Sequence, residues 1–98
     1  MRDYEMTVVF RADLDQKTRD ELVARVAGMI PLPEGDDVPE PKINVWGRRQ
    51  LAYPIQKLRE GYYVLYETSM EMGGIAEMER SMSYIEEILR HLVVRKEG

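Results

Sequence analysis

The alternation of apolar and polar residues predicts a β-strand over residues 4–10. One side of this strand carries the large apolar residues Tyr4, Met6, Val8 and Phe10. The other side carries Glu5 and Thr7, and such a period of two is typical of a strand with one buried face. We therefore expect this segment to line the core of a sheet.

Two later stretches repeat their apolar residues at helical spacing. The first begins near Asp13 or Asp15, either of which can accept backbone N–H groups of an opening turn, and Pro31 ends it. Its apolar stripe consists of Leu22, Val23, Val26, Ala27 and Ile30. The second begins at Gly73 and Gly74, and its stripe consists of Ile75, Met78 and Met82. Both stretches predict amphipathic helices that cover a sheet with their apolar sides.

Residues 42–55 and 62–68 predict the two strands of a β-hairpin, and residues 88–95 predict a last strand. One parity of the first hairpin strand carries Ile43, Val45, Leu51, Tyr53 and Ile55. Gly47 interrupts this strand, as a β-bulge would. Pro54 cannot donate to a strand ladder, so it places this strand at the edge of a sheet.

The elements follow in the order strand, helix, strand, strand, helix, strand, which is two split β-α-β units. This order predicts an α+β, ferredoxin-like fold for residues 1–98 as a single domain, a β-α-β-β-α-β sandwich with a four-stranded antiparallel sheet and two helices on one face. Right-handed crossovers put the first and third strands in the centre. The proline-rich residues 31–41 form an irregular acidic loop. This fold class hosts enzymes, sensors and RNA binders, so it leaves function open.

Composition narrows the classes of protein that remain. A chain of 98 residues holds one hydrophobic core, and its hydrophobic fraction of 44% is too high for a disordered protein. The absence of cysteine excludes a disulfide framework and a thiolate metal site, and it fits a reducing compartment. No apolar run approaches the roughly 20 residues that span a bilayer. We therefore expect a soluble protein without a membrane segment.

Charge is distributed unevenly along the chain. The net charge of -4 argues against a nucleic-acid binder with a uniformly charged surface. However, residues 42–66 hold five Lys or Arg against one Glu, whereas residues 1–41 hold five against ten Asp or Glu. Residues 67–98 are acidic as well, with four against seven. The middle of the chain is thus a basic segment, either a binding surface or a solvated loop with scattered charges.

Residues suited to catalysis or metal binding are few. His91 is the one histidine, and its place in the last predicted strand favours a packed or surface role over that of a base. Asp13 and Asp15, like Asp36 and Asp37, lack further ligands at the spacing of a cation-binding loop. The sequence therefore predicts no enzyme, no metal, no cofactor and no small-molecule substrate.

The basic segment contains the most distinctive residues of the chain. Trp46 and Gly47 precede the adjacent pair Arg48 and Arg49. Guanidinium groups beside an aromatic ring are suited to phosphate binding, base stacking or protein docking. The alternative is an ordinary edge hairpin whose arginines protect it against aggregation.

The sequence resembles the family of the sixth protein of the bacterial small ribosomal subunit, both in this segment and elsewhere along the chain. The matching positions are Met1, Arg2, Tyr4 and Glu5, then Leu14, Asp15 and Gln16, the block Trp-Gly-Arg-Arg-Gln-Leu-Ala-Tyr-Pro-Ile at 46–55 with Lys57, the Tyr-Val-Leu strand, and Arg90 with residues 92–95. A contiguous block of ten residues is more specific than a short motif, and the matches extend over nearly the whole chain. The family has the ferredoxin-like fold expected above.

The resemblance implies a structural protein of the cytoplasmic ribosome, without catalysis, that binds the central domain of small-subunit ribosomal RNA together with small-subunit protein eighteen. By resemblance, the residues assigned to RNA are Arg2, Tyr4, Lys57 and Arg90. Those assigned to the partner protein are Trp46, Arg48 and Arg49. Tyr4 also fits the core by its parity, and Arg90 also fits a structural place at the sheet. A partner can supply positive charge, so the acidity of the chain does not exclude RNA binding.

Two other functions remain open. Residues 61–66 resemble the aromatic strand of an RNA-recognition motif, but Glu60 stands where Lys or Arg is expected. A ferredoxin-like regulatory or interaction module that binds a metabolite would need a pocket with convergent polar groups. Two measurements distinguish an RNA binder from a metabolite-binding module. The RNA affinity of a phosphate-contacting protein falls steeply as salt rises, whereas a metabolite would shift the melting temperature of a module that binds it.

Overall fold

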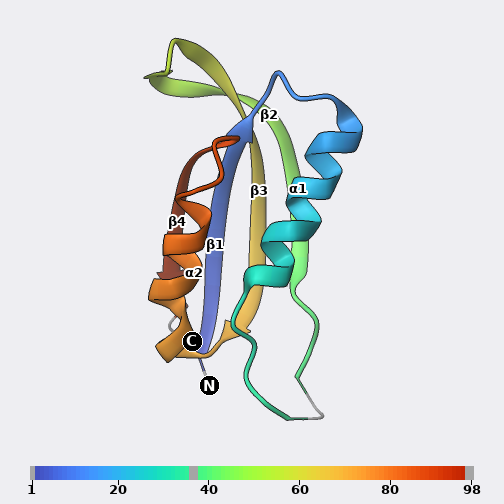
Figure 1. Cartoon of the computed structure of the whole chain (residues 1–98), viewed down its shortest axis with the longest axis vertical. Coiled ribbons are helices and arrows are strands. Elements are labelled where there is room, and N and C mark those ends of the chain that lie inside the picture. The colour runs from blue at the N-terminus through green and yellow to red at the C-terminus, as the bar shows by residue number, and fades with distance from the viewer. Residues whose placement is uncertain (1, 36–37, 97–98) are drawn as a thin grey trace.

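The computed structural model describes residues 2–35 and 38–96. Its elements are β1 (Arg2–Arg11), α1 (Gln16–Met29), β2 (Lys42–Ile55), β3 (Leu58–Met70), the short 3-10 helix η1 (Met72–Gly74), α2 (Ile75–Met82) and β4 (Ile88–Arg95). The four strands form one antiparallel sheet in the order β2-β3-β1-β4. Both helices lie on the same face of that sheet (Figure 1). The predicted fold is confirmed, with Pro54 on an edge strand.

The core lies between the helices and the sheet. Its fully buried side chains are Met6, Val8, Phe10, Val26, Val64, Tyr66, Met70 and Met82. The strand residues among them alternate along β1 and β3, and Val26 comes from the apolar stripe of α1. The Tyr66 hydroxyl donates a hydrogen bond of 2.8 Å to the Val23 carbonyl, which satisfies the polar end of this buried ring. Burial also raises the pKa of Tyr66.

Of the two aspartates that could cap α1, Asp15 is the one that lies at its N-terminus. Asp15 directly precedes the helix with an extended backbone, and its carbonyl accepts from the Arg19 N–H at 3.0 Å. Asp13 instead pairs with Arg11, whose Nη2 lies 2.9 Å from the carboxylate. The helix ends at Met29, shortly before Pro31, as the sequence predicts.

The β-bulge predicted in β2 at Gly47 is confirmed, and it divides the apolar residues of one parity between the two faces of the sheet. Val45 pairs with Val64 and Gly47 pairs with the next residue, Tyr63, so that Trp46 is an extra residue. Gly47 has φ of +84°, which glycine adopts without steric cost. The extra residue reverses the alternation, so Ile43 and Val45 lie on the helix side while Leu51 lies on the opposite side.

The β2–β3 hairpin is longer than predicted. Ile55 pairs with Leu58, so the turn consists of Gln56 and Lys57 alone, and β3 begins at Leu58 rather than at the predicted residue 62. Both turn residues have positive φ, +51° and +67°, as a type I′ turn requires. The hairpin extends beyond the end of the sheet and leans over the side of β4 (Figure 1). In the described residues, no helix has the length and apolar content to cross a membrane.

Candidate functional site

The face of the sheet opposite the helices, which we call the open face, carries apolar side chains that remain exposed. Leu92 and Val94 on β4 are 58% and 48% exposed, and Trp46 at the bulge of β2 is 48% exposed. In the described residues, no helix covers this face (Figure 1). Exposed apolar residues gathered on one face are typical of a surface that binds a macromolecule.

Two arginines lie against aromatic rings on this face. The guanidinium carbon of Arg49 is 5.6 Å from the centre of the Trp46 ring. The guanidinium carbon of Arg90 is 6.0 Å from the centre of the Tyr53 ring, and its Nη1 donates to the Tyr53 hydroxyl at 3.2 Å. We call these the two arginine–ring pairs. A ring attracts a cation without cancelling its charge, so both pairs retain a full positive charge.

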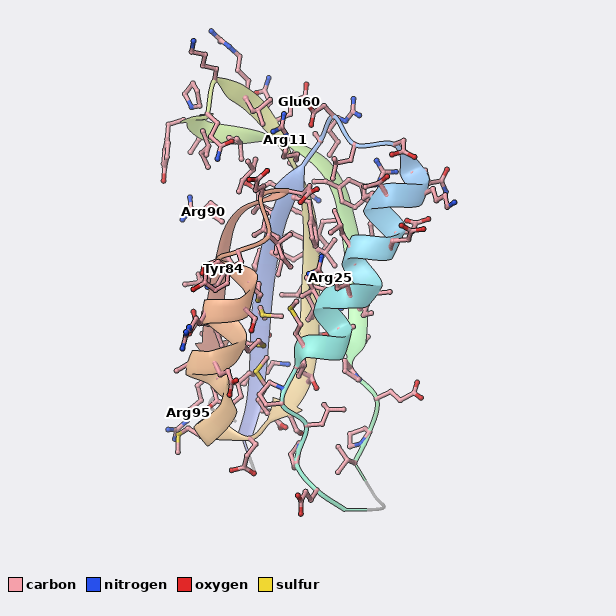
Figure 2. The ribbon with its side chains drawn as sticks, in the orientation of Figure 1. Arg11, Arg25, Glu60, Tyr84, Arg90 and Arg95 are labelled. Atoms are coloured by element: carbon pink, nitrogen blue, oxygen red, sulfur yellow. The ribbon has the colours of Figure 1, made fainter. Side chains whose placement is uncertain are left out.

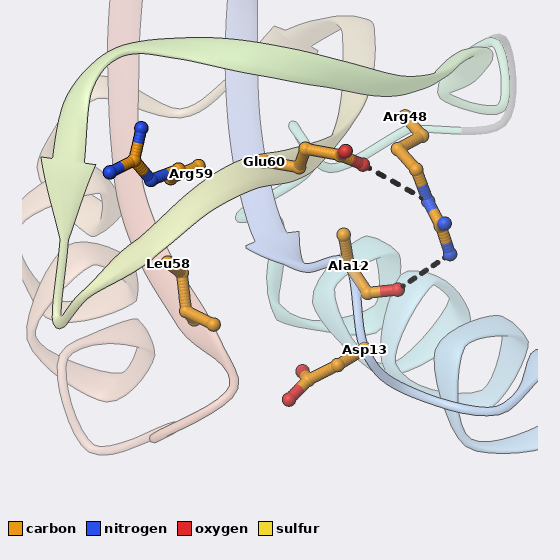
Figure 3. Close-up of a pocket in the computed structure, with 6 residues that line it drawn as sticks. All are labelled: Ala12, Asp13, Arg48, Leu58, Arg59 and Glu60. Atoms are coloured by element: carbon orange, nitrogen blue, oxygen red, sulfur yellow. Dashed lines mark hydrogen bonds and ion pairs between the residues drawn. The ribbon is translucent and has the colours of Figure 1, made fainter.

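Arg48 lies on the other side of the sheet from its neighbour Arg49. It pairs with Tyr62 on the helix side, its Nη2 donates to the Ala12 carbonyl at 3.0 Å, and its Nε lies 3.6 Å from a Glu60 carboxylate oxygen. Figure 3 shows these contacts at the mouth of a cavity of about 270 Å³. Arg48 thus joins the base of the hairpin to the end of β1, while Trp46 and Arg49 point to the open face.

Lys57 lies at the far end of the hairpin, in its turn. Its side chain is exposed, and the positive φ of its backbone is a conformation that costs a non-glycine residue roughly 1 kcal/mol. The turn therefore presents a lysine at the most projecting point of the hairpin, at some cost in stability.

Arg90 and His91 are neighbours on β4 that point to opposite faces. Arg90 is exposed on the open face (Figure 2), and it pairs in register with Val9. His91 points toward α2, where its Nε2 lies 2.8 Å from a carboxylate oxygen of Glu79. The histidine therefore joins the last strand to the second helix.

The remaining predicted RNA residues lie near the other end of the sheet. Tyr4 is 6% exposed and packs in the core beside Met6, the position that its parity allows. Arg2 begins β1, and its side chain lies outside the described part of the structure. The structure thus brings neither residue next to Lys57 or Arg90.

The end of the open face nearest the chain termini carries a network of ion pairs that the sequence analysis missed. Lys96 Nζ lies 3.3 Å from a Glu67 oxygen and 3.4 Å from a Glu5 oxygen, and Asn44 Nδ2 donates to Glu67 at 2.9 Å. The hydrogen bond from Lys96 is the main reason that the pKa of Glu67 falls below its ordinary value. These residues come from all four strands or their ends, so only the sheet register reveals them.

The cavities of the described residues are open and small. One of about 200 Å³ lies on the open face, and its lining residues are Thr7, Val9, Tyr63, Arg90, His91 and Leu92. Among the described residues, no cluster of three or more His, Cys, Asp or Glu could hold a metal ion. The open face therefore offers charged and aromatic side chains on a broad surface rather than an enclosed pocket.

Comparison with known proteins identifies the family of this chain. The family model of ribosomal protein S6 matches residues 3–95. Small ribosomal subunit protein bS6 of Carboxydothermus hydrogenoformans is 35% identical over 97 residues, covering 99% of this chain and 98% of the relative. The bS6 protein of Alkaliphilus metalliredigens is 34% identical over 95 residues, which cover 97% of each chain.

The fold agrees with that result. The crystal structure of 30S ribosomal protein S6 from Thermotoga maritima matches with a TM-score of 0.81 and 26% sequence identity, over 97% of this chain and 87% of that chain. Since the family model and both relatives extend over nearly the full length, the resemblance noted from the sequence is confirmed. This chain belongs to the ribosomal protein S6 family, and it is a protein of the small ribosomal subunit.

Proposed function

We propose that this protein binds the central domain of small-subunit ribosomal RNA together with small-subunit protein eighteen, as a structural component without catalytic activity. Family membership supports a role within the small subunit. The observation that carries the binding proposal is the pairing of Arg49 and Arg90 with rings rather than carboxylates. The charge of Arg90 is available to phosphate, and that of Arg49 to the partner protein, on a chain whose net charge is -4.

For the RNA contacts, the proposal relies on Arg90 and Lys57. Both side chains are exposed, and both lie on the hairpin side of the open face or at the hairpin turn. Arg2 is also proposed to contact RNA, on the basis of the resemblance to the family. Tyr4 contributes through the packing of β1, because its ring is almost fully buried.

For the protein contact, the proposal relies on Trp46 and Arg49. Tryptophan and arginine dominate the binding energy of protein interfaces more often than other residues do, and Trp46 is 48% exposed. Arg48 supports this surface from behind, through its contacts with Ala12 and Glu60. A partner that covers the apolar part of the open face would also add positive charge beside the RNA.

The RNA part is tested by measuring the affinity for a central-domain fragment across a salt series, with and without protein eighteen. We expect binding mainly in the presence of the partner, with affinity falling as salt rises. Lys57→Ala should reduce the slope of log K against log salt by roughly 0.7 to 0.9, the value for one phosphate contact. Lys17→Ala, on the exposed side of α1, is the matched control. Absence of binding with the partner at every salt concentration contradicts the proposal.

The protein part is tested by titrating protein eighteen into single variants by calorimetry. Trp46→Ala should weaken the complex by at least tenfold, since a central tryptophan is typically worth more than 1.4 kcal/mol. Tyr84→Ala is the control, because Tyr84 is 74% exposed and lies in the connection between α2 and β4 (Figure 2). Equal affinities of the two variants for protein eighteen would contradict the proposal that Trp46 lies in the interface.

A further inference from the structure

The contact between Tyr53 and Arg90 joins the two opposite edges of the sheet. Tyr53 belongs to β2 and Arg90 to β4, and two central strands separate these in the order β2-β3-β1-β4. The contact forms because the outer half of the hairpin bends toward the side of the sheet that carries β4 (Figure 1). The β2–β3 register is irregular between Gln50 and Ile55, which is the segment that contains Tyr53. The sheet geometry alone would not bring these side chains together.

The arginines at the hairpin end of the sheet differ in the groups that bind their side chains. Arg11 lies 2.9 Å from Asp13, and Arg48 lies 3.6 Å from Glu60, so a carboxylate offsets each of these charges. Arg90 makes no ion pair within the described residues, and its side-chain partner is a neutral phenol. A phenolic oxygen fixes a guanidinium by accepting one hydrogen bond and leaves its charge intact. Arg90 is therefore both held in place and available to an anion.

The direction of the held guanidinium is also set by its surroundings. Arg90 forms part of the wall of the open-face cavity, together with Tyr63 and Leu92. Val9, which pairs with Arg90 in register, is only 3% exposed although it lies on the open face. The stem of Arg90 thus lies beside a buried apolar side chain, while its guanidinium is bound by Tyr53 of the hairpin. Of the five N–H donors of a guanidinium, one is used by Tyr53, and the others make no hydrogen bond to the described residues.

We propose that Tyr53 is a positioning residue for Arg90, and that the pair acts as one phosphate-binding unit on the open face. The inference rests on the proposed RNA function and adds a residue that the function itself does not require. An arginine side chain loses considerable rotamer freedom when it binds, and a preformed hydrogen bond reduces that loss. Tyr53 therefore increases the affinity of Arg90 for phosphate without contacting the RNA itself.

The test is a double-mutant cycle on RNA affinity, using the full chain with protein eighteen and a central-domain RNA fragment. Tyr53→Phe removes only the hydroxyl, and we expect about a fivefold loss of affinity, the size of one hydrogen bond. Arg90→Ala should lose more and should reduce the salt slope by roughly 0.7 to 0.9. Adding Tyr53→Phe to Arg90→Ala should cause no further loss, because the tyrosine then has nothing to position.

A second measurement separates positioning from a purely structural role. Tyr53→Phe should leave the salt slope unchanged, since the number of phosphate contacts is the same, and it should leave the unfolding midpoint unchanged. Tyr84→Phe, at an exposed tyrosine away from the hairpin, is the matched control and should bind like the wild type. Additive losses in the double variant, or unchanged affinity of Tyr53→Phe, overturn the positioning role while the RNA function stands. Failure of the wild-type chain to bind RNA with its partner overturns both.

Discussion

The two faces of the sheet use the same kinds of residue for different purposes. On the helix-covered face, Met6, Val8 and Phe10 have no exposed surface. On the open face, Leu92 is 58% exposed and Val94 is 48% exposed, on a strand that pairs directly with β1. Burial of a large apolar side chain stabilises the fold by about 1.5 to 3 kcal/mol, whereas an exposed one contributes little.

This contrast indicates which residues of the protein can affect binding without affecting the stability of the fold. Residues of the helix-covered face determine whether the chain folds. Residues of the open face and of the hairpin can change while the fold persists, so their effects should appear in complexes with RNA or protein. Each of the following variants either tests that separation or locates its boundary.

The largest effect is expected from the core. Phe10→Ala should lower the free energy of unfolding by about 3 to 5 kcal/mol, because it removes a fully buried ring and leaves a cavity. Leu92→Ala on the open face should change it by less than about 1 kcal/mol. Urea denaturation of both variants provides the comparison. Similar losses would mean that the open face is part of the folded core.

A glycine substitution tests the contact between the hairpin and the open face. A Cβ at Gly61 would meet the Val9 Cγ1 atom and would lie 3.2 Å from the Leu51 Cδ2 atom, so Gly61→Ala should cost about 1 to 3 kcal/mol. Gly28→Ala is the control, because nothing lies within 4 Å of that Cβ and alanine favours the helix. It should stabilise by about 0.5 to 1 kcal/mol. Thermal unfolding measures both, and a neutral Gly61→Ala would mean that the hairpin packs loosely.

The hairpin turn should show stability and binding changing in opposite directions. Lys57→Gly relieves a positive φ at a non-glycine residue, and we expect a gain of about 0.5 kcal/mol in folding. The same change removes a proposed phosphate contact, so affinity for the RNA complex should fall. Gln56→Gly relieves the other positive φ and keeps the charge, so its affinity should not change. Equal RNA affinities of the two variants would show that Lys57 does not contact RNA.

The smallest effect is expected from the ion pairs around Glu67. Because the folded chain holds the pKa of Glu67 below its ordinary value of 4.5, its contribution to stability is present above that value and is lost as pH falls through the lower folded pKa. Glu67→Gln should therefore differ from the wild type most above pH 4.5, and the two should converge in acid. Urea denaturation at several pH values tests this, with Glu34→Gln as the control in the 31–41 loop. A difference that persists in acid would assign Glu67 a packing role.

The local pattern of apolar residues, together with the positions of proline, was sufficient to predict much of the fold. The strands predicted at 42–55 and 88–95 have those bounds in the structure, and Pro54 correctly indicated an edge strand. Period-two alternation and proline chemistry are local properties, so a single sequence contains them. The faces within β2 could not be predicted from parity alone, because one extra residue at Trp46 reverses the alternation. Gly47 signalled the bulge, but its effect on the later residues requires the register with β3.

The order of the elements, the helix-covered face and the basic character of the middle segment can all be predicted from the amino-acid sequence, because each depends on residues close together along the chain. That Arg48 and Arg49 point to opposite sides of the sheet follows from the assembled fold and not from the sequence. The assembled fold also brings Tyr53 to Arg90 from the opposite edge. Such contacts depend on a bulge, a twist and the bend of a hairpin, whose effects accumulate over many residues and become visible only when all four strands are assembled.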